Sequence, residues 1–228
     1  MNLIQSRQEF VTLINEMGLK TGVEVGVAKG EFSEFLLKNT KLEKLYSVDA
    51  WSGDLKSMKA YRRPTDVNNV DAYYQEAKNR LNPFGDRSVM IKDISENAVK
   101  KFENESLDFI YLDASHLFCG FAIDLINWWP KAKWNGIFAG HDFLRKSKYQ
   151  VSYALNGFCM EHKQFYYLTT KDIGRGSIPN PSWWLIKTQR DKAQWTKEFD
   201  IYKQTIKEQA KELNKSQKVD IMYECIDN

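Results

Sequence analysis

Two short segments of the sequence combine aspartate with histidine. Asp113 and His116 follow one apolar run, and His141 and Asp142 follow another. Both runs contain the β-branched and aromatic residues of buried strands, so each pair falls at the carboxyl end of a predicted strand. Because the carboxyl ends of parallel strands meet at one edge of a sheet, we expect Asp113 and Asp142 to point into the same crevice.

A bound divalent cation is the first chemistry that these residues suggest. Oxygen ligands from Asp113 and Asp142 would suit Mg²⁺ or Mn²⁺, whereas an imidazole ligand would favour a transition metal. The candidate ligands are therefore Asp113, His141 and Asp142. The alternative for each histidine is an ordinary surface or hydrogen-bonded residue.

A glycine-containing turn follows the first predicted strand, in the order Glu24-Val-Gly26-Val-Ala-Lys-Gly30. Glycines let the backbone bend tightly and approach a ligand, and the helix that follows offers free N–H groups. Asp49 ends the second predicted strand, where a carboxylate can bind both hydroxyls of a ribose. These features predict a nucleoside site. The alternatives are a plain strand-to-helix turn and a loop-capping aspartate.

The same turn suits S-adenosylmethionine (SAM) better than NAD. The dinucleotide fingerprint requires G-x-G-x-x-G, but Ala28 stands at its second glycine position and Glu31 at its third. The Glu31 carboxylate would be directed towards a pyrophosphate. SAM has no phosphate, so the chemistry favours SAM.

The segment from Asp108 to Phe143 resembles class I SAM-dependent methyltransferases, through the motifs DFIYLDASH, WW and NGIFAGHDF. The similar group, of the methyltransferase family 24 type, includes macrocin-type sugar O-methyltransferases and cephalosporin-hydroxylase-like proteins. Catechol O-methyltransferase is a more distant relative. The resemblance extends over about 22–158 and is weaker in the glycine loop.

The resemblance implies a set of cofactor-binding residues. In these relatives the two glycines pass beneath the methionine part of SAM, the second-strand acid binds the ribose, and a later segment lines the adenine. The corresponding residues here are Glu24, Gly26, Gly30, Asp49, Trp51, Ile94, Ser95, Glu96 and Asp113.

The resemblance also implies catalytic roles. Asp113 and Asp142 match metal-ligand positions, and His116 matches the position of a general base, a role that suits an imidazole titrating near neutral pH. His141 stands where relatives with metal sites usually have an acid, and is a further candidate for metal binding and catalysis. The expected reaction is O-methylation of a small hydroxylated acceptor such as a sugar or glycan. The alternatives are an NAD-type oxidoreductase and a non-catalytic SAM-binding module.

The acceptor is expected to carry negative charge or many hydroxyls. Basic residues occur in segments that would flank or reach the crevice: Lys56, Lys59, Arg62, Arg63, Arg145, Lys146, Lys148 and Arg175. Ordinary solvated surface is the alternative. The net charge of +3 is spread over many charges of both signs, which argues against a nucleic-acid partner.

The order of the predicted elements indicates an α/β fold. Apolar runs alternate with segments of helical spacing, which predicts a doubly wound, mostly parallel, Rossmann-like sheet with helices on both faces. A loop rather than a helix separates the last two runs, which predicts an antiparallel last strand. The seven predicted strands are 22–25, 44–48, 88–91, 107–112, 136–139, 165–168 and 183–186.

The chain is expected to form one methyltransferase domain over 1–188 and a helical extension over 189–228. An amphipathic helix over 191–215 would pack on this domain or on the partner in a homodimer. Three separated cysteines, Cys119, Cys159 and Cys225, suggest a reducing compartment. No run is long and apolar enough for a membrane helix, so we expect a cytoplasmic protein that does not bind membranes.

Overall fold

The computed structural model describes residues 3–52, 70–143, 150–172 and 180–216. Seven strands form one sheet in the order β3-β2-β1-β4-β5-β7-β6. They are β1 (Thr21–Val25), β2 (Lys44–Asp49), β3 (Ser88–Lys92), β4 (Leu107–Leu112), β5 (Ala132–Gly140), β6 (Tyr167–Leu168) and β7 (Trp183–Ile186). β1 to β5 are parallel, and β7 is antiparallel to both of its neighbours. The predicted fold class, with an antiparallel last strand, is confirmed.

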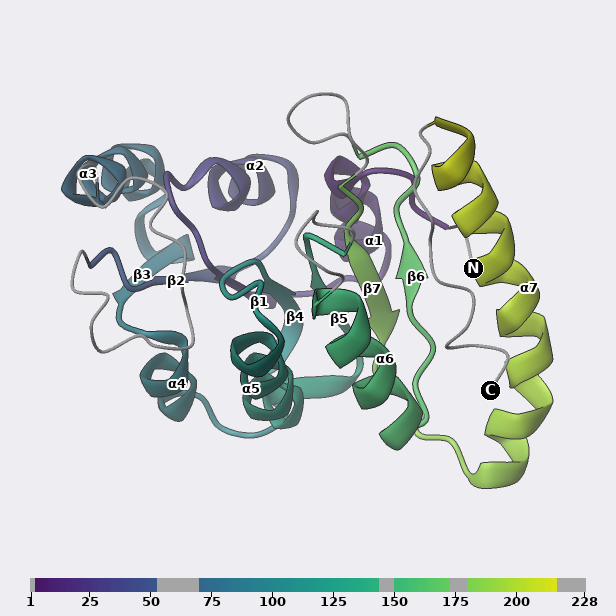
Figure 1. The fold of residues 1–228 in the computed structure, drawn as a ribbon. Helices are drawn as coiled ribbons and strands as arrows, with labels where there is room; N and C mark the ends of the chain where they lie inside the picture. Colours follow the sequence, from purple (N-terminus) through teal and green to yellow (C-terminus); the bar gives the residue numbers. More distant parts are fainter. Residues whose placement is uncertain (1–2, 53–69, 144–149, 173–179, 217–228) are drawn as a thin grey trace.

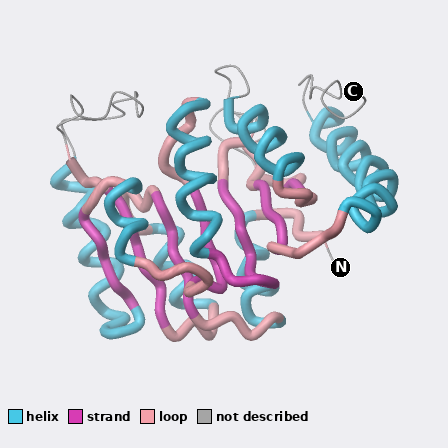
Figure 2. Tube along the Cα trace, turned by 90° about the horizontal axis from the view of Figure 1, so that it is seen from below, coloured by secondary structure: helices cyan, strands magenta, loops and turns pink. Residues whose placement is uncertain are grey.

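Helices cover both faces of the sheet (Figures 1 and 2). One face carries α1 (Phe10–Glu16), α2 (Glu31–Asn39) and α3 (Val70–Leu81), and the other carries α4 (Ser95–Ala98), α5 (Phe118–Trp128) and α6 (Gln150–Glu161). The long helix α7 (Lys192–Ser216) lies beside β6 at the end of the sheet. Among the described residues, none of the helices combines the length and apolar character that a membrane span requires.

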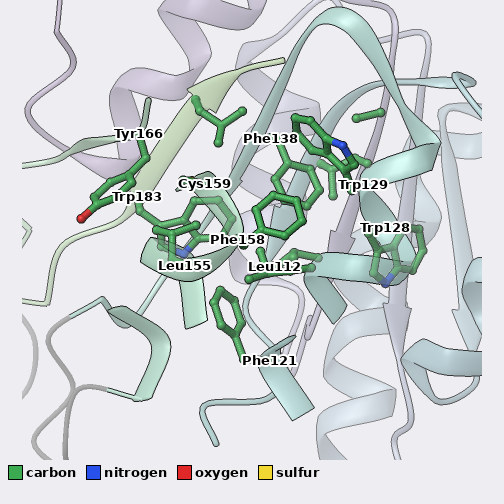
Figure 3. Packing of buried hydrophobic residues seen from close by; sticks show 14 of the residues in the cluster. Leu112, Phe121, Trp128, Trp129, Phe138, Leu155, Phe158, Cys159, Tyr166 and Trp183 are labelled. Carbon is green, nitrogen blue, oxygen red and sulfur yellow. The ribbon is translucent and has the colours of Figure 1, made fainter. Parts of the chain in front are cut away.

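The sheet separates two hydrophobic cores because successive side chains of a strand point to opposite faces. In β4, Phe109 and Tyr111 pack towards α1 and α2, whereas Ile110 and Leu112 join the aromatic core under α5 and α6. Figure 3 shows the second core, in which Trp183 of β7 lies near Phe121 and Phe138. Both faces of β4 are thus buried, as its nearly continuous apolar sequence predicts.

β5 begins at Ala132, four residues before the predicted start at Gly136. The ladder between β4 and β5 shifts register after Leu107, and Asn135 has a left-handed backbone with φ 64°. Asparagine tolerates this conformation better than most residues. The polar Asn135-Gly136 step, at which the predicted strand begins, is therefore an irregularity inside the observed strand.

Helix α7 contacts the domain through the apolar face predicted from its spacing. Tyr202 stacks on Phe165 with ring centroids 4.7 Å apart, and Ile206 and Leu213 are buried. The Gln209 amide accepts a hydrogen bond from Leu168 N at 3.0 Å and donates one to Leu168 O at 2.6 Å. It thereby pairs with backbone groups of the edge strand β6. The boundary at residue 188 and a dimer contact stay predictions.

Candidate functional site

The glycine loop leaves the carboxyl end of β1 and enters α2. Gly26 and Gly30 have φ values of 96° and 80°, and Gly30 is the N-cap of α2. A Cβ at position 26 would lie 2.2 Å from the carbonyl oxygen of Asp113, so the backbone of the loop packs directly on the end of β4. Only glycine fits there, because both its backbone angle and its surroundings exclude a side chain.

Asp49 lies at the end of β2 and holds the glycine loop in place through hydrogen bonds. Its two carboxylate oxygens accept hydrogen bonds from Ala28 N at 2.9 Å and Trp51 N at 2.8 Å. The buried Trp51 indole donates to Ala28 O at 2.7 Å. Each carboxylate oxygen has a second lone pair, so Asp49 keeps acceptor capacity for the hydroxyls of a ribose.

The segment predicted to line the adenine begins α4. Ser95 is buried, and its hydroxyl donates to Asp124 at 2.5 Å and accepts from Trp128 Nε1 at 2.9 Å. The single hydroxyl proton of Ser95 is therefore used inside the protein, so it is not available to adenine in this conformation. Asp124 of α5 is itself buried, so this hydrogen bond lies inside the protein.

The acid–histidine group forms at the carboxyl ends of β4 and β5. Ligand atoms of Asp113, His141 and Asp142 lie within 4.8 Å of one another, which is the predicted metal-ligand set. His116 Nε2 contacts Asp142 Oδ2 and lies 3.5 Å from Asp113 Oδ1. Asn180 donates to Asp142 Oδ1 at 2.8 Å, and Asp142 has a strained backbone with φ 57°. The sequence contains no motif that marks Asn180.

The charge on His116 differs from the expectation. Burial lowers the pKa of His116, but its contacts with Asp113 and Asp142 outweigh burial and raise the pKa to about 9. The imidazole is therefore protonated at neutral pH in the metal-free protein. The argument that an unperturbed imidazole titrates near neutral pH does not apply here, because two carboxylates face the ring.

Arg7, from the N-terminal segment, is a site residue that the sequence analysis missed. Its guanidinium lies 3.9 Å from the centroid of the Phe32 ring and within ion-pair distance of Glu24 and Asp113. No motif surrounds Arg7, and it is distant in sequence from both acids. A buried acid in the middle of a strand, as at Glu24, is the one indirect signal, because such a group requires a cation or a proton.

The structure brings the predicted residues together along one edge of the sheet. From β2 to β5 the strand ends carry Asp49, the Gly26 loop, Asp113 and Asp142 in that spatial order. The Glu31 side chain is exposed, and its Oε1 lies 3.7 Å from Arg80 Nη2. The Glu31 carboxylate therefore does not point towards a ligand in the glycine loop, contrary to the expectation. The basic residues at 56–63, 145–148 and 175 lie outside the described residues.

The strand order and the position of the site define a Rossmann-like α/β protein of the methyltransferase class. Residues 23–143, more than half of the chain, match the methyltransferase domain of family 24. The chain belongs to this family, and the prediction of a SAM-dependent methyltransferase is confirmed. The match spans the glycine loop and both acid–histidine segments, so the family favours a methyltransferase over the NAD-type alternative.

Solved structures share the fold at low sequence identity. An O-methyltransferase from Bacillus cereus in complex with S-adenosylhomocysteine (SAH) aligns with a TM-score of 0.57 and 11% identity, over 82% of this chain and 83% of that chain. A methyltransferase from Geobacter sulfurreducens aligns at 0.53 and 13%, over 82% and 81%. An rRNA methylase from Streptococcus thermophilus aligns at 0.54 and 13%, over 80% and 94%. The fold therefore does not select the acceptor. No curated protein sequence is significantly similar to the chain.

Proposed function

We propose that this protein transfers the methyl group of SAM to an oxygen of a small hydroxylated acceptor, such as a sugar or glycan. The observation that carries the proposal is the convergence of Asp113, His116, His141 and Asp142 beside the glycine loop. This arrangement places polar and titratable groups next to the predicted donor site. A non-catalytic SAM-binding module would have no need of such a group.

The residues present fit SAM as the donor. The glycine loop has no side chain at its closest approach to β4, and Asp49 offers acceptor lone pairs beyond its hydrogen bonds from Ala28 N and Trp51 N. Bound SAM supplies an electrophilic methyl group on a cationic sulfur. The protein then has to hold the acceptor oxygen in line with that methyl and receive the proton of the hydroxyl.

The residues also fit a divalent cation. Two carboxylates and one imidazole nitrogen converge within 4.8 Å, which is a plausible set for Mg²⁺ or Mn²⁺, with the nitrogen favouring a transition metal. A bound cation would supply charge that lowers the pKa of an acceptor hydroxyl. Asn180 holds Asp142 in place by its hydrogen bond at 2.8 Å.

His116, in its neutral form, is proposed to receive the proton of the acceptor hydroxyl. Because Asp113 and Asp142 raise the pKa of His116 in the metal-free protein, this role requires a cation on the two carboxylates, whose charge would lower that pKa again. Its ring lies between the carboxylates of Asp113 and Asp142 and is partly exposed, so a substrate can reach it. The two acids orient the ring and determine where its proton resides. An acceptor bound over the ends of β4 and β5 would meet His116 and His141 together.

The test is methyl transfer from SAM to a panel of sugars, sugar nucleotides and small hydroxylated acids, measured as SAH release. Asp142→Asn should abolish turnover while SAH binding, followed by calorimetry, stays within about threefold of wild type. The matched control is Asp108→Asn. Asp108 is also an ion-paired carboxylate, 2.8 Å from Lys133, but it lies at the start of β4, at the opposite end of the strands from the site. It should keep turnover.

Three outcomes separate the parts of the proposal. Absence of SAH binding by the wild type, even at millimolar ligand, would reject the donor assignment. Full turnover after exhaustive EDTA treatment would reject the cation and keep the methyltransferase. Binding of SAH without turnover on any acceptor, including nucleic acid, would support the non-catalytic module instead.

A further inference from the structure

Arg7 is a largely buried cation at the carboxyl end of β1 and β4. Its side chain is 22% exposed, and the guanidinium carbon lies 3.9 Å from the centroid of Phe32 and 5.0 Å from that of Tyr111. Both rings belong to the core under α1 and α2. A guanidinium held against aromatic faces keeps its in-plane N–H groups free to bind an anion.

The two acids near Arg7 satisfy it poorly. The closest approaches are 3.5 Å to Glu24 and 3.6 Å to Asp113, longer than the roughly 2.7–2.9 Å of a charge-assisted hydrogen bond. Arg7 Nε is buried and has no hydrogen-bond partner among the described residues. Burial also raises the pKa of Glu24 to about 8, so Glu24 is mostly uncharged at neutral pH and offers Arg7 little countercharge. The donor groups of Arg7 are thus left for another acceptor.

The N-terminal segment fixes Arg7 in this position. Its backbone N–H donates to both carboxylate oxygens of Asp172, at 2.8 and 3.0 Å. The carbonyl oxygen of Gln5, two residues before Arg7, accepts hydrogen bonds from Thr170 N at 3.0 Å and Lys171 N at 2.7 Å. Arg7 is therefore pre-organised by backbone contacts, and binding an anion would require little reordering of the chain.

The spatial order of the strand ends indicates which anionic group would bind to Arg7. A ribose bound by Asp49 lies at β2, and the acid–histidine group for the acceptor lies at β4 and β5. The sulfur that carries the methyl group must therefore lie between them, near the Gly26 loop on β1. The amino-acid end of SAM branches from the same sulfur, so it falls within the region bounded by Gly26 and Arg7.

We propose that Arg7 binds the α-carboxylate of the methionine part of SAM through its guanidinium, and so acts as a cofactor-binding residue. The proposal rests on SAM being the donor, as proposed above. Its chemistry is the bidentate match between a planar guanidinium and a carboxylate. The alternative is that Arg7 only neutralises Glu24 and Asp113 and stabilises the fold.

The two roles differ in their response to the ligand. We would measure by calorimetry the dissociation constants of SAH and of its decarboxylated analogue, S-adenosyl-3-thiopropylamine, for wild type, Arg7→Lys and Arg7→Ala. The readout is the ratio of the two constants for each protein. Wild type should prefer SAH. Arg7→Ala should lose about 10- to 100-fold of this preference, the range for a hydrogen bond to a charged group, and Arg7→Lys should fall in between.

Arg190→Ala is the matched control. Arg190 also combines an ion pair, 2.8 Å to Glu198, with a ring contact, 4.7 Å to Phe165, but it follows the end of β7 at the opposite edge of the sheet. Its ratio should equal that of wild type. If Arg7→Ala does not fold, Arg7→Lys still reports the ratio.

Each outcome decides between the two roles. Equal weakening of both ligands in the Arg7 variants would overturn the proposal and assign Arg7 a structural role. An unchanged ratio with unchanged affinities would overturn it as well. Failure of wild type to bind either ligand would instead reject SAM as the donor, so the two failures are distinguishable.

Discussion

Glu24 offers a sharp test of the electrostatics of the site. It is 1% exposed, and burial raises its pKa from 4.5 to about 8 despite Arg7 and the Ser33 hydroxyl that donates to it. The negative charges of Asp113 and Asp49 raise the pKa further. Between pH 4.5 and 8 the folded protein therefore retains a proton that the unfolded chain releases. Stability from this group is complete below pH 4.5 and is lost as the pH rises to 8.

The magnitude follows from the size of the shift. One pKa unit corresponds to about 1.4 kcal/mol, so a shift of about 3.5 units gives up to about 5 kcal/mol across the interval. Glu24→Gln cannot ionise but keeps an acceptor for Ser33. The free energy of unfolding of the variant, relative to wild type, should therefore increase by about 1 kcal/mol per pH unit between pH 5 and 8.

The assay is urea unfolding of both proteins at half-unit steps from pH 5 to 8.5. Subtracting the free energy of unfolding of wild type from that of the variant at each pH cancels the contribution of all other titrating groups. Glu34→Gln is the control of opposite sign, because hydrogen bonds from Lys38 and Arg80 lower the pKa of Glu34. A difference for Glu24→Gln that is constant with pH, or that favours wild type above pH 6, would refute the reasoning and show Glu24 ionised and paired with Arg7.

Two further predictions concern packing. Gly26→Ala should destabilise the fold by about 3 kcal/mol or more and abolish SAH binding, because a Cβ would collide with a backbone carbonyl. Gly157→Ala, in open space on α6, should instead stabilise by about 0.5–1 kcal/mol in urea unfolding. Tyr202→Ala should cost about 3 kcal/mol, because its ring stacks on Phe165. Ile201→Ala, 71% exposed, should cost below about 0.5 kcal/mol; equal losses would contradict the packing of α7.

The sheet was predictable because its signals are local. β4 and β7 are nearly continuous apolar runs, which are typical of strands buried on both faces of a sheet. The boundaries failed where local patterns mislead. The predicted β5 began at Gly136 because the polar Asn135-Gly136 step interrupts the apolar run, whereas the strand begins at Ala132. The predicted strand 165–168 is observed only as β6 (Tyr167–Leu168), because Phe165 and Tyr166 pack into the core before the ladder begins.

The candidate site was predictable only where residues follow strands. Asp49, Asp113 and Asp142 could be placed because a strand end fixes which edge of the sheet a residue occupies. Arg7 and Asn180 reach the site through segments with no periodic pattern, and they lie far apart in the sequence. Their positions depend on long-range contacts such as that between Arg7 N and Asp172, and no spacing in a single sequence encodes these.

Asp113 connects the donor and acceptor ends of the site. Its carbonyl oxygen lies against Gly26, and its carboxylate lies between Arg7, at 3.6 Å, and His116, at 3.5 Å. A substitution of Asp113 would therefore disturb both the Arg7 guanidinium beside the glycine loop and the His116 imidazole beside the proposed metal ligands. Arg7 contacts Glu24 of β1 and Asp142 follows β5, and these two strands flank β4, so variants at the two positions can separate cofactor binding from methyl transfer.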